Sequence, residues 1–126
     1  MSMPRWSRFA DTGWALFIVF ALAIAISHGT AQLATVVVFV GIGSAMTGWI
    51  VRRPGRGAFV TSLVLGVLHT VEQSAYLAAD FGKHPVSASM VGADTEGLIA
   101  GLLIVVGSVG CLRASRRNRE MVPSAV

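Results

Sequence analysis

The sequence has few charged residues for its length. Only 13% of its 126 residues are charged, whereas 54% are hydrophobic, and a soluble domain usually carries about 25% charged residues. The apolar residues gather in four blocks, each close to the ~20 residues that a helix needs to cross a ~30 Å hydrocarbon core. This scarcity of charge excludes an ordinary soluble domain. It predicts an all-α membrane protein, a four-helix antiparallel transmembrane bundle formed as one domain by residues 1–126.

Residues that carry common chemistries are also scarce. Cys111 is the only cysteine, so the chain forms no internal disulfide and no cysteine metal cluster. Haem ligation by two histidines needs both at one depth, but His28 and His69 fall about 15 Å apart along upright helices. A metal site from His69, Glu72 and Glu96 would need Glu96 to lie about two turns deeper. We therefore expect neither haem nor a metal site, and the cofactor stays unassigned.

Known sequence signatures are missing as well. The chain has no CxxC pair, no glycine-rich phosphate loop, and no serine or cysteine in an activating setting. It also lacks the early membrane glutamate of small multidrug exporters and the asparagine and glycine signatures of small fluoride channels. No family is assigned from the sequence.

Lysine occurs once, at Lys83, and the basic character comes from arginine. The arginines form three clusters that each adjoin the end of an apolar block: Arg5 and Arg8; Arg52, Arg53 and Arg56; Arg113, Arg116, Arg117 and Arg119. The positive-inside rule then places both termini and the loop at 52–56 in the cytoplasm, and the loop after Phe81 outside. We expect a multi-pass protein of the inner or plasma membrane whose arginines contact the lipid bilayer rather than nucleic acid.

Local signals predict helices at about 12–28, 31–51, 58–81 and 95–112, followed by a flexible basic tail at about 114–126. Asp11 is placed to cap the first helix and Gly82 to end the third. The loop 83–93 is the longest connection, and its small, apolar middle at 86–92 is expected to rest on the mouth of the bundle as a lid. The first apolar run follows two arginines and also fits a cleaved signal peptide. That alternative stays open.

Small residues recur four apart in two of the blocks. Such pairs let another helix approach closely, so we predict that they mediate helix packing, either inside the bundle or in a homo-oligomer or larger membrane complex. They are Gly41, Ser44, Ala45 and Gly48 in the second block, and Gly97 and Gly101 in the fourth.

The third block carries polar residues that a membrane helix seldom tolerates. Residues three and four apart share a helix face, and this spacing predicts one polar stripe of Ser62, Gly66, His69, Glu72, Gln73, Tyr76 and Asp80. Because lipid cannot satisfy polar groups, the stripe should face other helices or a water-filled cavity. A charged Glu72 near the bilayer centre is costly, so we expect it to be protonated or to share a proton with His69.

Polar residues of the other blocks fall at the depth of the outer half of this stripe. We predict an outward-facing polar pocket built from His69, Glu72, Gln73 and Tyr76 together with His28, Gln32, Thr35 and Glu96. Simpler roles stay open. The stripe fits a hydrogen-bonded network that fixes helix register, Glu96 fits a stabilising contact at a helix N-terminus, and His28 fits a helix end at the membrane interface.

Three classes of function follow from this layout. The first is a non-enzymatic accessory or assembly subunit, or a binder of a lipophilic small molecule. The second is a proton-coupled transporter that uses Glu72 and His69. The third is an intramembrane isomerase or cyclase acting on an isoprenoid or sterol-like substrate, with Glu72 as acid and His69 as base. The absence of a complete catalytic set favours the first class.

Overall fold

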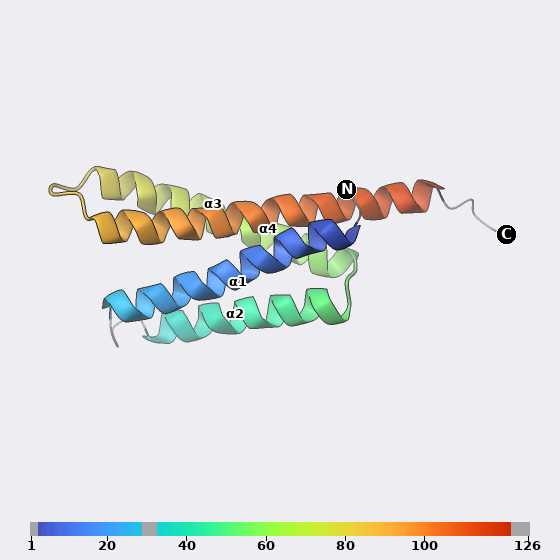
Figure 1. Cartoon of the computed structure of the whole chain (residues 1–126), viewed down its shortest axis with the longest axis horizontal. Helices are drawn as coiled ribbons and strands as arrows, with labels where there is room; N and C mark the ends of the chain where they lie inside the picture. The colour runs from blue at the N-terminus through green and yellow to red at the C-terminus, as the bar shows by residue number, and fades with distance from the viewer. Residues whose placement is uncertain (1–2, 29–32, 122–126) are drawn as a thin grey trace.

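A computed structural model describes residues 3–28 and 33–121, and almost all of these residues are helical. Its helices are α1 (Met3–His28), α2 (Leu33–Arg52), α3 (Arg56–Phe81) and α4 (Ala88–Met121). Successive helices run in opposite directions (Figure 1). The prediction of an all-helical protein with four helices is confirmed.

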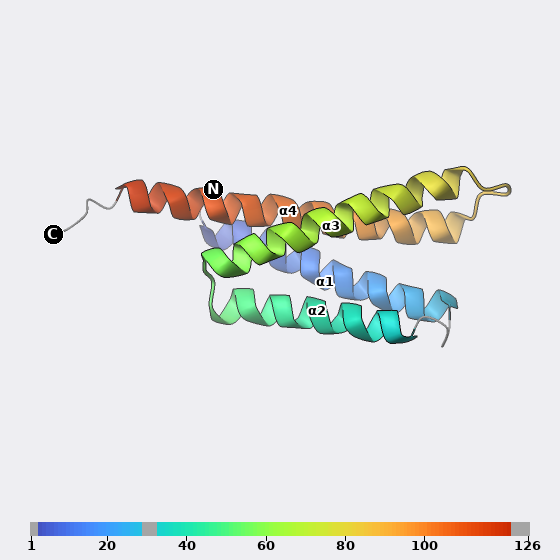
Figure 2. The ribbon, with the colours of Figure 1, turned by 180° about the vertical axis from the view of Figure 1, so that it is seen from behind.

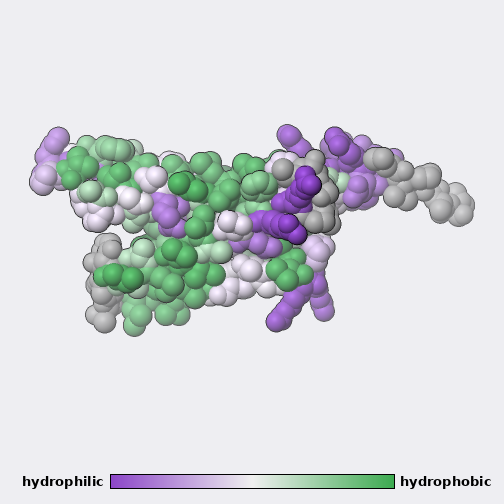
Figure 3. Space-filling view, viewed as in Figure 1, coloured by the Kyte–Doolittle hydropathy of each residue, from purple (hydrophilic) through white to green (hydrophobic). Residues whose placement is uncertain are grey.

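Three of these helices are long and apolar enough to cross a membrane. Within the described part of the chain the candidate spans are Arg5–Ile26, Leu33–Arg52 and Ala88–Glu120, in α1, α2 and α4. The helix α3 has 26 residues, as many as α1, but His69, Glu72 and Gln73 reduce its hydropathy. Figure 3 shows hydrophobic surface over most of the bundle, and hydrophilic surface mainly at the end that holds the N-terminus and the α2–α3 turn, and at the tip of the α3–α4 turn.

Two helices are longer than predicted. The helix α1 begins at Met3, so Asp11 lies inside it and does not cap it. The helix α4 begins at Ala88, where the Ser87 hydroxyl accepts a hydrogen bond from the Met90 amide at 3.5 Å. Ser87 therefore occupies the capping position at the start of α4, and the predicted lid at 86–92 is wrong because most of it is helical.

The other end of α4 also extends beyond the prediction. Residues 114–121, predicted as a flexible tail, continue the helix, and 122–126 lie outside the described residues. Arg116 and Glu120 form an ion pair at 3.2 Å, and this four-residue spacing supports a helix. Gly82 is the C-cap of α3, as predicted.

The four helices form an uneven bundle. The helix α4 packs along both α1 and α3, and α2 packs along α1, whereas α2 and α3 make few contacts. Figure 2 shows why: α3 crosses α4 obliquely, starting beside the end of α2 and finishing beside the start of α4, away from α2. We call the end with the α2–α3 turn and the arginine clusters the basic end, and the end with the α3–α4 turn the distal end.

The seam between α1 and α4 is closed by small residues. A Cβ atom on Gly13 would lie 2.7 Å from the Ile104 backbone nitrogen, and one on Gly107 would collide with the Ala10 backbone. Gly97 and Gly101 also lie at buried contacts, against Gln73 and Phe20 and against Thr70 and His69. These glycines let α4 approach both α1 and α3 closely.

The predicted packing residues of α2 lie elsewhere. A Cβ atom on Gly41 or Gly48 would meet nothing within 4 Å, and Ser44 and Ala45 are exposed. The prediction that this set packs inside the bundle is corrected: α2 buries one narrow face, on which Gly43 meets Ile18 of α1. A role in contacting a second membrane protein stays a prediction.

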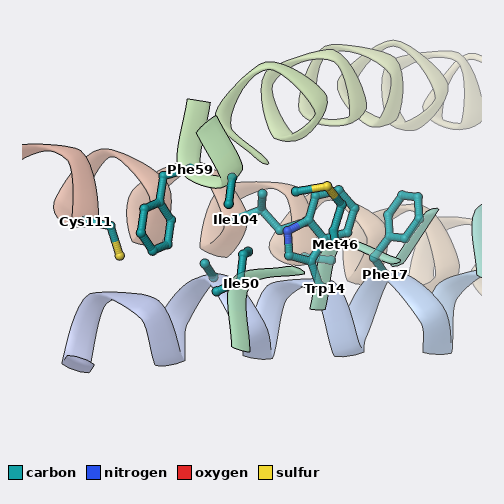
Figure 4. Close-up of a cluster of buried hydrophobic side chains, with 10 residues drawn as sticks. Trp14, Phe17, Met46, Ile50, Phe59, Ile104 and Cys111 are labelled. Atoms are coloured by element: carbon teal, nitrogen blue, oxygen red, sulfur yellow. The ribbon is translucent and has the colours of Figure 1, made fainter. Parts of the chain in front are cut away.

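The hydrophobic core lies nearer the basic end, where all four helices meet. Figure 4 shows its larger members pointing into the space between α1, α3 and α4. They are Trp14, Phe17, Met46, Ile50, Phe59, Ile104 and Cys111. The wide apolar face of α3, with Val60, Val64, Val67, Leu68 and Val71, is exposed on the outside.

Candidate functional site

The polar stripe of α3 divides into a buried row and an exposed edge. Ser62, Gly66, His69, Gln73 and Asp80 are buried, whereas Glu72 and Tyr76 are exposed. The prediction of a single inward-facing stripe is therefore corrected. The physical reason is that α3 is covered by α4 but diverges from α2, so its neighbours cover only a narrow row.

At the basic end the row is fully hydrogen-bonded. The Trp14 indole N–H donates to the Ser62 hydroxyl at 2.9 Å, and the Ser108 hydroxyl donates to the same oxygen at 2.8 Å. These bonds join α1, α3 and α4 through one buried side chain. They act as a structural connection, and sequence reasoning missed them because they link residues more than 40 positions apart.

In the middle of the bundle His69 is enclosed by aromatic rings. Phe17 and Phe20 approach it edge-on, with ring centroids 4.7 and 5.5 Å from that of the imidazole. The ring forms a backbone hydrogen bond with Gly97, while its Nε2 atom has no hydrogen-bond partner. Among the described residues no ion pair joins His69 to Glu72, so the expected sharing of a proton between these side chains is corrected.

At the distal end the helices enclose a cleft of about 290 Å³, to which all four contribute. The cleft has a polar side, largely from α3, and an apolar side, largely from α1 and α2. Its lining residues are Phe20, Ile24, Thr35, Phe39, Glu72, Gln73, Tyr76, Ala79, Asp80, Lys83, Met90 and Asp94.

The cleft contains some of the predicted pocket residues and omits others. Thr35, Glu72, Gln73 and Tyr76 line it, while His69 lies one turn deeper along α3 and does not. Glu96 is half-buried outside the cleft, and Asp94 lines it instead. Gln32 and the side chain of His28 lie outside the described residues.

Several lining residues were not in the predicted pocket. Asp80 and Lys83 are three residues apart, a spacing that brings opposite charges together on a helix and was available in the sequence. Phe20 and Phe39 carried no such signal, because an aromatic residue in an apolar block is indistinguishable from a core residue until the helices are placed.

Two oxygen atoms of residues that line the cleft lack hydrogen-bond partners, and both expose almost no surface, so neither is open to the cleft. They are Gln73 Oε1 and Asp80 Oδ2, on residues that are only 1% and 3% exposed. The other Asp80 oxygen lies 3.6 Å from Lys83 Nζ, which is longer than the ~2.7–2.9 Å of a strong charge-assisted hydrogen bond. Both unsatisfied atoms are acceptors, and a buried polar atom without a partner costs about 1–3 kcal/mol.

The lining of the cleft carries charged side chains of both signs. Glu72, Asp80 and Asp94 supply three carboxyl groups and Lys83 one ammonium group. No cluster of three or more histidine, cysteine or acidic residues suited to a metal ion occurs in the described part of the chain. Searches among protein-family models, curated proteins and solved structures found no match to this chain.

Proposed function

We propose that the protein crosses the membrane four times, with both termini in the cytoplasm. The three arginine clusters adjoin one end of the bundle, which supports this orientation. The helix α3 spans about 39 Å at 1.5 Å per residue, and its apolar face is exposed while its polar row is directed at α4. That division suits a helix with lipid on one side and protein on the other. It also favours a retained α1, because α1 supplies Trp14 and Phe17 to the core.

Cysteine labelling tests this topology. In a Cys111→Ala background, we expect Ala88→Cys to react with a membrane-impermeant maleimide in intact cells, and Gly55→Cys to react only after permeabilisation. Both positions are exposed, so neither label is blocked by packing. Labelling of position 55 from outside, with none at position 88, contradicts the proposal.

We infer that the protein is a non-enzymatic binder of a lipophilic small molecule, held in the distal cleft. The observation that carries this inference is a cleft of about 290 Å³ built by all four helices, with Phe20 and Phe39 on its apolar side and Glu72 and Tyr76 on its polar side. A ligand with an apolar body and a polar group would suit this lining, because small-molecule sites combine apolar walls with a few placed polar groups.

The arrangement favours this reading over the two alternatives. An isomerase or cyclase would need Glu72 and His69 on one substrate, but Glu72 faces the cleft and His69 is enclosed by Phe17 and Phe20. A proton-coupled transporter would need a route to the basic end, where the Trp14–Ser62–Ser108 bonds occupy the bundle interior. An assembly role through the exposed small residues of α2 stays a second prediction.

A matched pair of substitutions tests the inferred site. Ala79→Trp fills the cleft, while Ala78→Trp places the same side chain at a neighbouring exposed position outside the lining. We expect native mass spectrometry of detergent-extracted protein to find one co-purified lipophilic molecule in the wild type and in Ala78→Trp, and none in Ala79→Trp. Retention of the molecule in Ala79→Trp, or its absence from the wild type, contradicts the proposal.

A further inference from the structure

A groove at the basic end is lined by arginines from two helices. Figure 2 shows α4 running past the start of α3, and residues from both of these segments line the groove. Its volume is about 510 Å³, and its lining residues are Arg56 and Val60 of α3 with Leu112, Arg116, Arg119 and Glu120 of α4. We call it the arginine groove. It shares no lining residue with the distal cleft, so it is a separate candidate for binding.

The charges of the arginine groove are not balanced by its own residues. Its lining holds three guanidinium groups and one carboxyl group, which leaves a formal excess of two positive charges. Arg116 Nε lies 3.2 Å from Glu120 Oε1, so this pair accounts for the carboxyl group. Among the described residues Arg56 and Arg119 take part in no ion pair. Because guanidinium groups stay charged, the groove attracts a ligand with two negative charges.

The depth of the arginine groove matches the headgroup layer of a membrane. The helix α3 runs from Arg56 to Phe81, so Arg56 lies about 19 Å from its midpoint at 1.5 Å per residue. For an upright α3 centred in the bilayer, that is just beyond the ~15 Å half-thickness of the hydrocarbon core. Val60 lies about 13 Å from the midpoint, inside the hydrocarbon. The charged and apolar parts of the groove therefore fall on the two sides of this boundary.

Toward the bilayer centre the arginine groove continues into an apolar surface. Val60 and Leu112 line the groove, and Val64 and Val67 are exposed on α3. Val60, Val64 and Val67 are four and three residues apart and so share one face of the helix. An acyl chain would cover this surface, whereas a soluble phosphate compound would leave it bare. The combination of arginines with an adjoining apolar face favours a lipid.

We propose that the arginine groove binds an anionic phospholipid whose headgroup carries two negative charges, with its phosphate between Arg56 and Arg119 and an acyl chain along Val60 and Val64. Guanidinium groups bind phosphate oxygens through paired N–H donors, and basic pockets between transmembrane helices on the cytoplasmic side suit such headgroups. This rests on the proposed membrane crossing and is independent of the distal cleft. The bound headgroup links the start of α3 to α4.

Four probes separate the charge of the headgroup from the acyl chains. They are dioleoyl phosphatidic acid (a terminal phosphate with about two charges), dioleoyl phosphatidylglycerol (one charge), dioleoyl phosphatidylcholine (no net charge) and glycerol 3-phosphate (a terminal phosphate without chains). Native mass spectrometry of the full chain in a nonionic detergent measures the affinity for each added probe. We expect phosphatidic acid to bind about fivefold more tightly than phosphatidylglycerol, phosphatidylcholine to bind more weakly than both, and glycerol 3-phosphate to bind least.

Matched charge removals identify the groove. Arg56→Gln and Arg119→Gln should each weaken the binding of phosphatidic acid about fivefold. Arg117→Gln is the control, because Arg117 is an exposed arginine of the same helix that does not line the groove, and it should change the affinity less than about twofold. Glu120→Gln should strengthen binding, because it removes the negative charge of the groove and releases Arg116. A general loss of structure would not produce that opposite sign.

The outcomes separate the groove from the simple charge of the basic end. Equal affinities for the three lipids, or equal weakening by Arg117→Gln and Arg119→Gln, overturn the proposal. Glycerol 3-phosphate binding as tightly as phosphatidic acid overturns the assignment to a lipid and indicates a soluble phosphate compound.

The Ala79→Trp variant distinguishes this site from the distal cleft. It should bind added phosphatidic acid as tightly as the wild type does, because Ala79 lines the distal cleft and not the arginine groove. Loss of this binding in Ala79→Trp, with no effect of Arg56→Gln or Arg119→Gln, would place the lipid in the distal cleft and overturn the arginine groove. If the arginine variants weaken phosphatidic acid while Ala79→Trp keeps its co-purified molecule, the arginine groove stands and the distal-cleft proposal fails.

Discussion

The two halves of α3 carry the same kind of polar row but use it differently. In the basic half, Ser62 is buried and takes part in two hydrogen bonds, with Trp14 and Ser108. In the distal half, Gln73 and Asp80 are equally buried, yet each has an oxygen without a partner beside a cleft. The residue spacing along the helix does not explain the difference. What differs is the neighbouring groups: Ser62 meets an indole N–H and a hydroxyl group, whereas the Gln73 oxygen lies against Gly97.

The charges of the two halves follow the same division. At the basic end, Arg116 and Glu120 pair at 3.2 Å with side chains that are 82% and 66% exposed, and exposed pairs of this kind contribute about 0–1 kcal/mol. At the distal end, the Asp80 side chain is almost fully buried. The arginines can therefore be solvated by water or lipid headgroups, whereas the buried Asp80 carboxyl group has Lys83, at 3.6 Å, as its ion-pair partner.

The largest expected effect on stability comes from forcing α1 and α4 apart in the basic half. A Leu side chain at Gly107 would collide with the Ala10 backbone, and neither helix backbone can yield as a flexible side chain would. We expect Gly107→Leu to destabilise the protein by about 3 kcal/mol or more, measured by thermal unfolding in detergent. Gly41→Leu is the control, because a Cβ atom there meets nothing within 4 Å. Equal unfolding temperatures for the two variants would show that the α1–α4 seam is not closed.

A smaller effect is expected from removing the acceptor that joins three helices. Ser62→Ala leaves the Trp14 indole N–H and the Ser108 hydroxyl without their shared partner, at a cost of about 1–3 kcal/mol. Chemical unfolding in mixed micelles measures this loss. Combining Ser62→Ala with Ser108→Ala should cost less than the sum of the two single substitutions, because the second change removes one of the unsatisfied donors. Strict additivity would mean that the hydroxyl groups do not interact.

Local signals in the sequence predicted the number of helices. The arrangement of the site depends on contacts between residues that are far apart in the sequence. The apolar blocks predicted four helices and Gly82 the end of the third, because each signal acts within a few residues. The start of α4, predicted at about residue 95, lies at Ala88 after the Ser87 cap, because whether residues 88–94 form helix depends on how they pack. The division of the polar stripe could not be predicted at all. It depends on the crossing of α3 over α4, which is set by contacts such as that of Gly66 with Ile104.

The smallest expected effect on stability is that of substituting Glu72. For this residue the structure changes the expectation drawn from the sequence. An inward-facing Glu72 would leave its partners unsatisfied on replacement by leucine, so Glu72→Leu should then be clearly worse than Glu72→Gln. The structure places Glu72 at the exposed edge of the cleft, where substitutions usually change stability by less than about 0.5 kcal/mol. We therefore expect both variants to unfold within that margin of the wild type in mixed micelles. Gln73→Leu sharpens the test: it removes an acceptor that already lacks a partner, so it should be neutral or slightly stabilising, the opposite sign from Ser62→Ala. A loss of more than about 1 kcal/mol in Glu72→Leu alone would mean that this carboxyl group is held inside the bundle, and that the distal half is closed like the basic half.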